Sequence, residues 1–367
     1  MEHLQKTLDE IVDKISYLES KRLKIGQFLK EINDSMIIGP NEEIKDEKII
    51  NKVSINQINK ISVLGIDGGI VKHSYHGLDL MLTRSVGVNF IHSNGKLDKV
   101  DYYPNSNPIP NPIVIFDQFS DLELSSCYNF ERQTMEILTA IDAAEKFKPD
   151  MVLLDGSIIP HYVPKPDNPV LREYYNTLIG TYKALFELCE SKKFILAGVV
   201  EDSRGVKFCD ILNRRILSQV KSEIIKELRL VLEKTKDSNL LYYVLDKGER
   251  TCVFNYSQNP ETHPVLKEFT DMNDSFYSFY LKTVDFDRPL RIDFVCSHDL
   301  PKVVDKLSTV MMQTSGHSGY GLPAVLIEAD QRAKLSENDM NMFYSDLITR
   351  IGNISTLFKM RREMRPF

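Results

Sequence analysis

The sequence predicts an α/β protein in which a mixed central sheet is flanked by helices and follows an N-terminal helical segment. Heptad-spaced aliphatic residues run through positions 1–34, and apolar stretches alternate with amphipathic helices from Ile61 onward. These two patterns divide the chain. We expect residues 1–60 to form a helical segment and connector, a candidate dimerisation element, and residues 61–367 to form the main domain.

The overall composition is that of a globular protein. Of the 367 residues, 42% are hydrophobic and 27% are charged, and no apolar run is long enough to span a bilayer. The N-terminus lacks the apolar core of a secretory signal. The five cysteines form no CxxC pair, so neither a zinc cluster nor a disulfide framework is predicted. We therefore expect a cytoplasmic protein with no membrane partner.

The net charge excludes a simple basic coat for nucleic acid. It is −6 at pH 7. A site built from carboxylates is locally acidic, however, and would recruit divalent cations before a phosphodiester approaches. Contact with a nucleic-acid backbone would then depend on local basic groups rather than on net charge.

The N-terminal heptad allows two interpretations. Such a seam is typical of a coiled coil, and it is equally compatible with a helix that packs on its own domain. The sequence leaves both open. The residues of the seam are Leu4, Leu8, Ile11, Ile15, Leu18, Ile25, Leu29 and Ile32.

The remaining elements are assigned from apolar runs and helical periodicity. Glycines at 68, 69 and 77 are expected to mark turns between the first two strands, and residues 104–112 form a loop. The predicted strands are 61–66, 78–90, 151–154, 194–200, 240–245, 251–256, 277–284 and 290–295. The predicted helices are 130–146, 170–189, 207–235 and 336–361.

Two strands each end in the same pair of residues, an aspartate followed by a glycine. VLGIDGG places Asp67 after an apolar run, and VLLDGS places Asp155 in the same way. The carboxyl ends of such strands are where α/β proteins collect ligands, and the glycine lets the backbone turn away. Asp-Gly is also an ordinary turn signal. Two occurrences in one chain favour a functional role.

A third carboxylate, Glu136, is expected at the same height. Its helix runs antiparallel to the strand that ends at Asp155, and rises of about 1.5 Å per helical residue and 3.3 Å per strand residue bring positions 136–138 level with that aspartate. A carboxylate on a buried helix face needs a partner. The partner is either a metal ion or Arg132, which lies at helical spacing. Glu131 is the less favoured alternative ligand.

Three carboxylates at one edge of a sheet predict a site for a hard cation. Oxygen ligands suit Mg²⁺ or Mn²⁺ rather than Zn²⁺. Two such ions about 3.5–4 Å apart activate water and stabilise a leaving oxygen in phosphodiester hydrolysis. We therefore predict that Asp67, Glu136 and Asp155 hold two divalent ions.

The ordered motifs resemble one protein family. The strand with IDGG, the helix with RQTMEILTA, the strand with LLDGS, the AGVV strand and the late GYGLPAVLIEADQRAKL resemble the NurA family of archaeal and bacterial repair nucleases, over most of the chain from Ile61. The resemblance implies a ribonuclease-H-like domain and Mn²⁺-dependent action on DNA. It also implies a homodimer that works with the hexameric ATPase HerA in resecting double-strand-break ends, with acidic ligands at Asp67, Glu136 and Asp155.

The late motif departs from the family pattern. NurA proteins tend to have Gly-Tyr-Pro followed by Ala-His, whereas here Tyr320 precedes Gly321 and the second pair is Ala329-Asp330. The resemblance makes Asp330 a further candidate ligand and Tyr320 a candidate to orient a phosphate or the attacking water. An aromatic residue buried in a glycine-rich turn is the structural alternative for Tyr320.

A second departure concerns the basic residues. Family members often carry a lysine after the AGVV strand, where this chain has Glu201. Nearby basic side chains would then have to hold the phosphate backbone, and a basic tail at residues 359–365 is a further candidate. The nucleic-acid-binding candidates are Arg204, Lys207, Arg214 and Arg215.

Two other functions remain open at this stage. VLGIDGG also resembles the first phosphate motif of actin-like sugar kinases, although Ile70-Val71-Lys72 replaces the expected glycines. The altered late motif also allows a NurA-like protein that assembles a complex without catalysis. Cleavage of DNA with a divalent ion and without ATP separates the nuclease from both.

Overall fold

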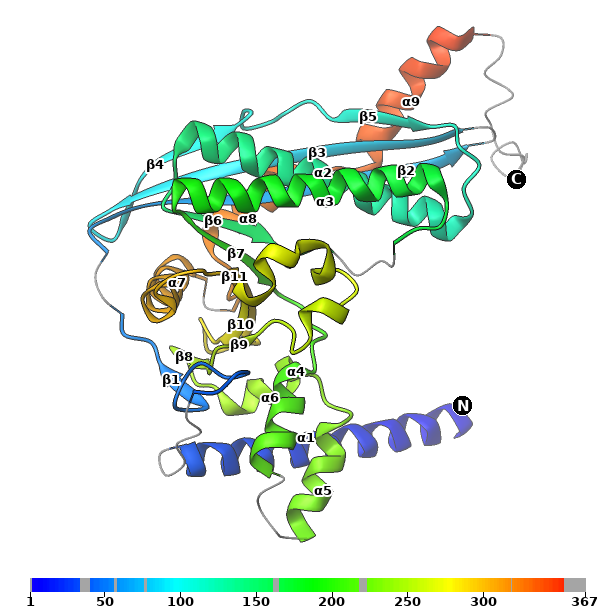
Figure 1. Cartoon of the computed structure of the whole chain (residues 1–367). Coiled ribbons are helices and arrows are strands. Elements are labelled where there is room, and N and C mark those ends of the chain that lie inside the picture. Colours follow the sequence, from blue (N-terminus) through cyan, green and yellow to red (C-terminus); the bar gives the residue numbers. More distant parts are fainter. Residues whose placement is uncertain are drawn as a thin grey trace. The chain divides into compact units, whose positions relative to one another are not determined.

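The structure is a computed structural model that describes residues 2–33, 40–55, 58–75, 78–160, 165–217, 223–317 and 319–352 (Figure 1). The chain forms two compact units. Unit 1 comprises Met1–Asn56, Gly198–Gln258 and Asp274–Pro323, and unit 2 comprises Gln57–Ala197, Asn259–Asn273 and Ala324–Phe367. No helix among the described residues is long and apolar enough to cross a membrane.

Unit 2 is built on an antiparallel meander followed by parallel strands. Its sheet has the order β4-β3-β2-β6-β7, with β5 paired to the far end of β3. β2 pairs antiparallel with β3 and parallel with β6. This is the strand arrangement of ribonuclease H. The strands are β2 (Lys60–Tyr75), β3 (Leu78–Ser93), β4 (Lys96–Tyr103), β5 (Asn111–Ile115), β6 (Met151–Asp155) and β7 (Ile195–Val200), at which the chain passes into unit 1.

Helices cover both faces of this sheet. α2 (Asp121–Phe147) and α3 (Pro169–Lys192) pack on each other, and α2 lies against β2 and β3 (Figure 1). α8 (Ala324–Ala333) packs on β2 from the opposite face, and α9 (Glu337–Ile351) follows it. Ser120 and Glu123 form a capping box at the start of α2. α2 ends at its C-cap residue Lys148, which has a left-handed backbone conformation. The chain then enters β6 after a short connection, so α2 and β6 run antiparallel.

Unit 1 combines a run of strands with one long helix, α1, and several shorter helices. The sheet order is β1-β8-β10-β11, and β9 pairs with β10. The strands are β1 (Ile50–Lys52), β8 (Glu249–Thr251), β9 (Phe254–Asn255), β10 (Phe276–Leu281) and β11 (Leu290–Val295). The helices are α1 (Glu2–Asn33), α4 (Lys207–Ile211), a π-helical turn (Leu212–Ile216), α5 (Glu223–Leu232), α6 (Asp237–Val244) and α7 (Leu300–Thr314). Two 3₁₀ segments, Pro260–Thr262 and Leu266–Ser275, fall mostly within the Asn259–Asn273 part of unit 2.

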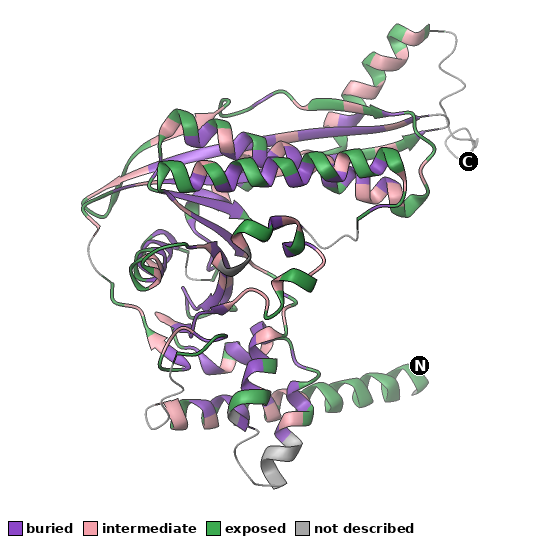
Figure 2. Ribbon diagram, viewed as in Figure 1, coloured by how far each residue is buried: buried purple, intermediate pink, exposed green. Residues whose placement is uncertain are grey.

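The second half of α1 confirms that the heptad packs on its own unit, and the coiled coil stays a prediction for the first half. Ile25 and Leu29 are fully buried in the core of unit 1, with Leu18 and Ile32 packed against them. The first half of the helix is exposed along the same seam, as Figure 2 shows in green. The exposed seam residues are Leu4, Leu8, Ile11 and Ile15.

The predicted α/β class with a mixed sheet, flanking helices and an N-terminal helix is confirmed, but several elements differ. The predicted strand 240–245 is the helix α6, because Leu240, Leu241 and Val244 bury one helical face in unit 1 and this packing overrides strand propensity. The single helix expected over 207–235 is divided among α4, the π-helical turn and α5.

The meander was also predicted incompletely. The turn expected at Gly68 and Gly69 is wrong, because β2 continues through both glycines to Tyr75 and pairs with β3 along its whole length. Strands β4 and β5 were not predicted, and β5 occupies the end of the expected loop. The final helix is described to Ile351, so the predicted helix end and the basic tail lie outside the described residues.

Candidate metal centre

The site begins where β6 ends beside β2. β6 pairs with β2 only from Val63 to Ile66, so from Asp67 onward this edge of β2 is not covered by β6. Asp155 is the last residue of β6 and is exposed there. Asp67 is buried, and its Oδ1 accepts the Gly68 N–H at 2.7 Å. The two aspartates predicted from the Asp-Gly pairs therefore lie at one edge of one sheet, in unit 2.

The glycines around Asp67 allow two helices to approach β2. Successive strand residues face opposite sides of a sheet. Gly65 and Gly69 lie against α8, where a Cβ would meet the backbone of Val325 and Ala333. Gly68 faces α2, and a Cβ there would overlap the side chain of Glu136. The missing Cβ at Gly68 is thus what lets Glu136 lie against the strand beside Asp67.

Glu136 is buried to the same degree as Asp67. Only 8% of the residue is exposed, and Arg132, one turn earlier on α2, donates from Nη1 to Oε1 at 2.6 Å. Burial raises the pKa of Glu136 to about 8, against the lowering effect of Arg132. The arginine pairing considered from the sequence is therefore present, and it leaves the buried carboxylate incompletely compensated.

The other carboxylates of the set act electrostatically on Asp67 and Glu136. Burial raises the pKa of Asp67, and the charge of Asp330 raises it further, whereas the Gly68 N–H and the Asp155 side chain lower it. Asp67 and Asp155 both raise the pKa of Glu136. Asp330 lies exposed near the end of α8. In unit 2, Asp67 thus lies within electrostatic range of the three other predicted ligands, Glu136, Asp155 and Asp330.

This set fits a divalent cation in its chemistry. All donors are carboxylate oxygens, and negative charge exceeds the positive charge that Arg132 supplies. In the regions that the structure describes, no three His, Cys, Asp or Glu side chains are arranged as a complete metal site. Asp67 accepts the Gly68 N–H, and Glu136 pairs with Arg132. Glu131, the alternative ligand, is half-buried with a pKa raised by burial.

Tyr320, the aromatic candidate of the late motif, and Glu201, a departure from the family pattern, meet in unit 1. The Tyr320 hydroxyl donates to Oε1 of Glu201 at 2.7 Å, and 38% of the tyrosine is exposed. The buried-aromatic alternative therefore does not describe this residue. The hydroxyl and the carboxylate form one polar pair, so their roles are coupled.

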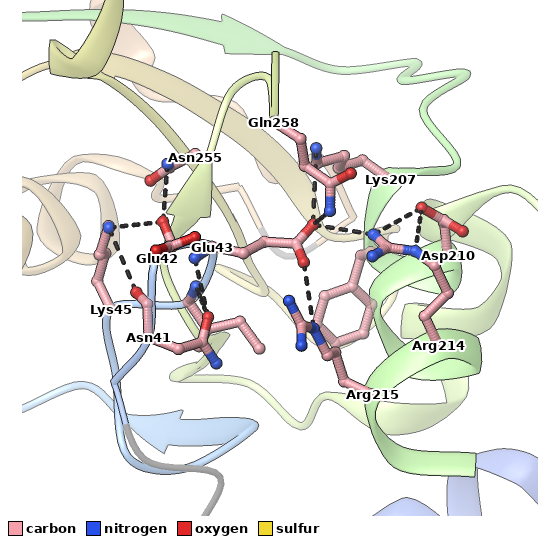
Figure 3. A network of polar contacts seen from close by, with 12 residues as sticks. Asn41, Glu42, Glu43, Lys45, Lys207, Asp210, Arg214, Arg215, Asn255 and Gln258 are labelled. Atoms are coloured by element: carbon pink, nitrogen blue, oxygen red, sulfur yellow. Dashed lines mark hydrogen bonds and ion pairs between the residues drawn. The ribbon is translucent and has the colours of Figure 1, made fainter. Parts of the chain in front are cut away.

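Three of the basic candidates converge on one carboxylate of unit 1, as Figure 3 shows. Glu43 is 4% exposed, and its Oε1 lies 3.0 Å from Nη2 of Arg214 and 3.7 Å from Nζ of Lys207. Nε of Arg215 lies 3.6 Å from Oε2. The Gln258 amide also donates to Glu43. Arg204 lies apart as an exposed residue of the loop before α4.

The sequence did not reveal Glu43. It contacts Arg214 across 171 positions of chain, and no local pattern indicates such a pairing. The π-helical turn that carries both arginines was likewise not predicted. Asp210, one turn before Arg214, holds that guanidinium through a pair at helical spacing, which is a recognisable signal.

Comparisons with known proteins agree with this architecture. A crystal structure of the NurA nuclease from Sulfolobus solfataricus matches with a TM-score of 0.56 and 16% identity, covering 93% of this chain and 98% of that one. A structure of NurA bound to dAMP and manganese matches with a TM-score of 0.44 and 11% identity, covering 98% of both chains. No curated protein sequence matches. The family model described as the NurA domain matches residues 61–335, and the chain therefore belongs to the NurA family.

Proposed function

We propose that the protein is a deoxyribonuclease that hydrolyses phosphodiester bonds with Mn²⁺ or Mg²⁺. The observation that carries this proposal is the buried carboxylate set of unit 2, in which Asp67 and Glu136 are desolvated and lack enough positive charge. Membership of the NurA family supports the choice of reaction, because the similar Sulfolobus solfataricus protein is a nuclease. The sugar-kinase alternative finds no support in the comparisons.

Each carboxylate has a distinct part in this proposal. Asp67 and Asp155, adjacent at the edge of the sheet, would share the ions, Glu136 would complete the oxygen shell from α2, and Asp330 would add a ligand from α8. A pair of divalent ions bound there would lower the pKa of water and stabilise the leaving oxygen. The protein's own contribution is to fix these oxygens on rigid elements and to keep Glu136 away from bulk water.

The basic residues of unit 1 would hold the DNA backbone. Arg214 and Arg215 are exposed on the π-helical turn, Arg204 is exposed on the preceding loop, and Lys207 begins α4. Glu43 and Asp210 neutralise part of this charge, so we propose that these residues contribute only a small part of the affinity for DNA. Tyr320 would orient a phosphate or the attacking water through its hydroxyl.

The biological setting is also a proposal. A homodimer acting with a HerA-type hexameric ATPase in the resection of double-strand breaks, in the cytoplasm, fits the family resemblance. The exposed aliphatic seam in the first half of α1 supports residues 1–60 as a dimerisation element attached to a nuclease domain over 61–367.

The test is cleavage of end-labelled DNA by the purified protein. We expect products with Mn²⁺ or Mg²⁺, none with EDTA, and no requirement for ATP. Asp67→Ala should abolish cleavage, whereas Asp142→Asn, an exposed change on α2, should not. A wild type that cleaves nothing with either ion would contradict the proposal and leave the assembly role. Phosphorylation of a sugar by ATP would favour the kinase.

A further inference from the structure

Arg132 holds the carboxylate of Glu136, which is a proposed metal ligand. Its Nη1 lies 2.6 Å from Oε1, and its charge lowers the pKa of both Glu136 and Asp67. A divalent ion coordinated by Glu136 would approach the same carboxylate. Two cations at one carboxylate repel each other strongly in a buried site, where screening by water is weak.

The arginine is also placed to move outward. Its side chain is 30% exposed, whereas that of Glu136 is 10% exposed, so the guanidinium lies on the solvent side of the carboxylate. Four helical residues separate the two positions, a rise of about 6 Å along α2. Because α2 runs antiparallel to β6, this rise carries Arg132 past Asp155, the last residue of the strand. Asp155 is exposed at that end.

We propose that Arg132 is an exchangeable counter-ion, which holds Glu136 in the metal-free protein, yields it to the divalent ion and then binds a phosphate oxygen of the DNA strand. This inference rests on the proposed nuclease function. Arg132 is a positioning residue for Glu136 before metal binding and a substrate contact afterwards. Guanidinium suits both tasks, because its donors match the planar oxygens of carboxylate and phosphate alike.

The exchange predicts opposite effects of one substitution on two ligands. Arg132→Gln removes the competitor, so calorimetry without DNA should show Mn²⁺ affinity raised by about tenfold, the effect of one pKa unit at a carboxylate. The same variant should cleave DNA with a raised KM. A merely structural arginine would instead lower both affinities together, or neither.

Two control variants distinguish a general effect of charge, or a loss of folding, from the specific role of Arg132. Lys146→Gln removes one positive charge from an exposed position of the same helix and should leave both affinities within about twofold of the wild type. Arg132→Lys keeps the charge and protects the fold if the glutamine variant is unstable. It should bind Mn²⁺ within about threefold of the wild type but show a raised KM, because lysine cannot bind phosphate in the bidentate manner.

The outcomes are distinct. A wild type that binds Mn²⁺ and cleaves DNA, together with an Arg132→Gln variant whose Mn²⁺ affinity is unchanged or lower, overturns the exchange and leaves the nuclease proposal intact. An Arg132→Lys variant with wild-type KM overturns the phosphate contact. A wild type that neither binds Mn²⁺ nor cleaves DNA overturns the nuclease proposal, and the exchange with it.

Discussion

The two units contain charge clusters of opposite design. In unit 2, the charges of neighbouring carboxylates raise the pKa of Asp67 and Glu136, and the charge of Arg132 lowers it. In unit 1, Lys207, Arg214 and Arg215 surround the buried carboxylate of Glu43 (Figure 3). Both clusters bury a glutamate, and among the described residues Glu136 forms an ion pair with one cation whereas Glu43 forms ion pairs with three.

The difference shows which cluster needs an outside partner. Burial raises the pKa of Glu136 to about 8, a sign that its charged form is poorly compensated. Three cations contact Glu43, and Arg214 also pairs with Asp210. We therefore interpret the unit 2 cluster as a site for an external cation and the unit 1 cluster as a structural pairing.

The largest expected effect is on catalysis. Asp155→Asn removes a ligand at the exposed end of β6 and should lower kcat by about 10³-fold, because metal ions contribute several kcal/mol to the transition state and each 1.4 kcal/mol is tenfold in rate. Single-turnover cleavage of DNA with Mn²⁺ measures this. Asp150→Asn, five positions earlier and outside the carboxylate set, is the control. If the cleavage rate of Asp155→Asn lies within tenfold of the wild-type rate, Asp155 is not a metal ligand and the interpretation of the unit 2 cluster is wrong.

The second effect is on the stability of unit 1. Glu43→Ala leaves three cations without their shared partner and should destabilise the protein by about 3–5 kcal/mol, as removal of one side of a buried pair does. Asp210→Ala breaks an exposed pair with Arg214 and should cost at most about 1 kcal/mol. Urea unfolding measures both. Equal losses would show that Glu43 is no more important than a surface charge.

A backbone change tests how Glu136 is placed. Gly68→Ala would put a methyl group onto the Glu136 side chain and should cost about 1–3 kcal/mol, as overpacking does. It should also lower the affinity for Mn²⁺, because Glu136 has to move from β2. Gly180→Ala in α3 meets open space and should slightly stabilise the protein. Thermal unfolding and Mn²⁺ titration check both variants, and a wild-type affinity for Gly68→Ala would contradict this placement of Glu136.

A further expected effect is a pH dependence of stability in the absence of metal. The pKa of Glu136 is raised on folding from 4.5 to about 8, so between these values the folded state binds more protons than the unfolded state. Stability in EDTA should therefore fall as pH rises from 5 to 8. Glu136→Gln should flatten this profile. A decline of equal slope in the variant would assign the dependence to other groups.

The sequence was informative where local pattern and topology coincide. The apolar strands before Asp67 and Asp155 were predicted because buried strands are continuous apolar runs. The position of Glu136 on α2, level with Asp155, followed from the rise per residue of helix and strand. In the structure Glu136 interacts electrostatically with Asp67 and Asp155. Their role as ligands stays a prediction.

Other features depend on contacts that a single sequence does not encode locally. Gly68 was interpreted as a turn, whereas its missing Cβ makes room for a glutamate 68 positions later. Glu43 meets its arginines across an even longer separation. α6 took a helical form because packing in unit 1 outweighed the strand propensity of its aromatic residues.

The most direct test is a Mn²⁺ titration followed by electron paramagnetic resonance, which detects the free ion. The account predicts saturable binding to the wild type at pH 8, and a loss of at least about tenfold in affinity for each of Asp67→Asn and Glu136→Gln, the lower end of what metal-site substitutions cost. Asp142→Asn should bind as the wild type does. Undiminished binding by both site variants would contradict the assignment of the metal centre.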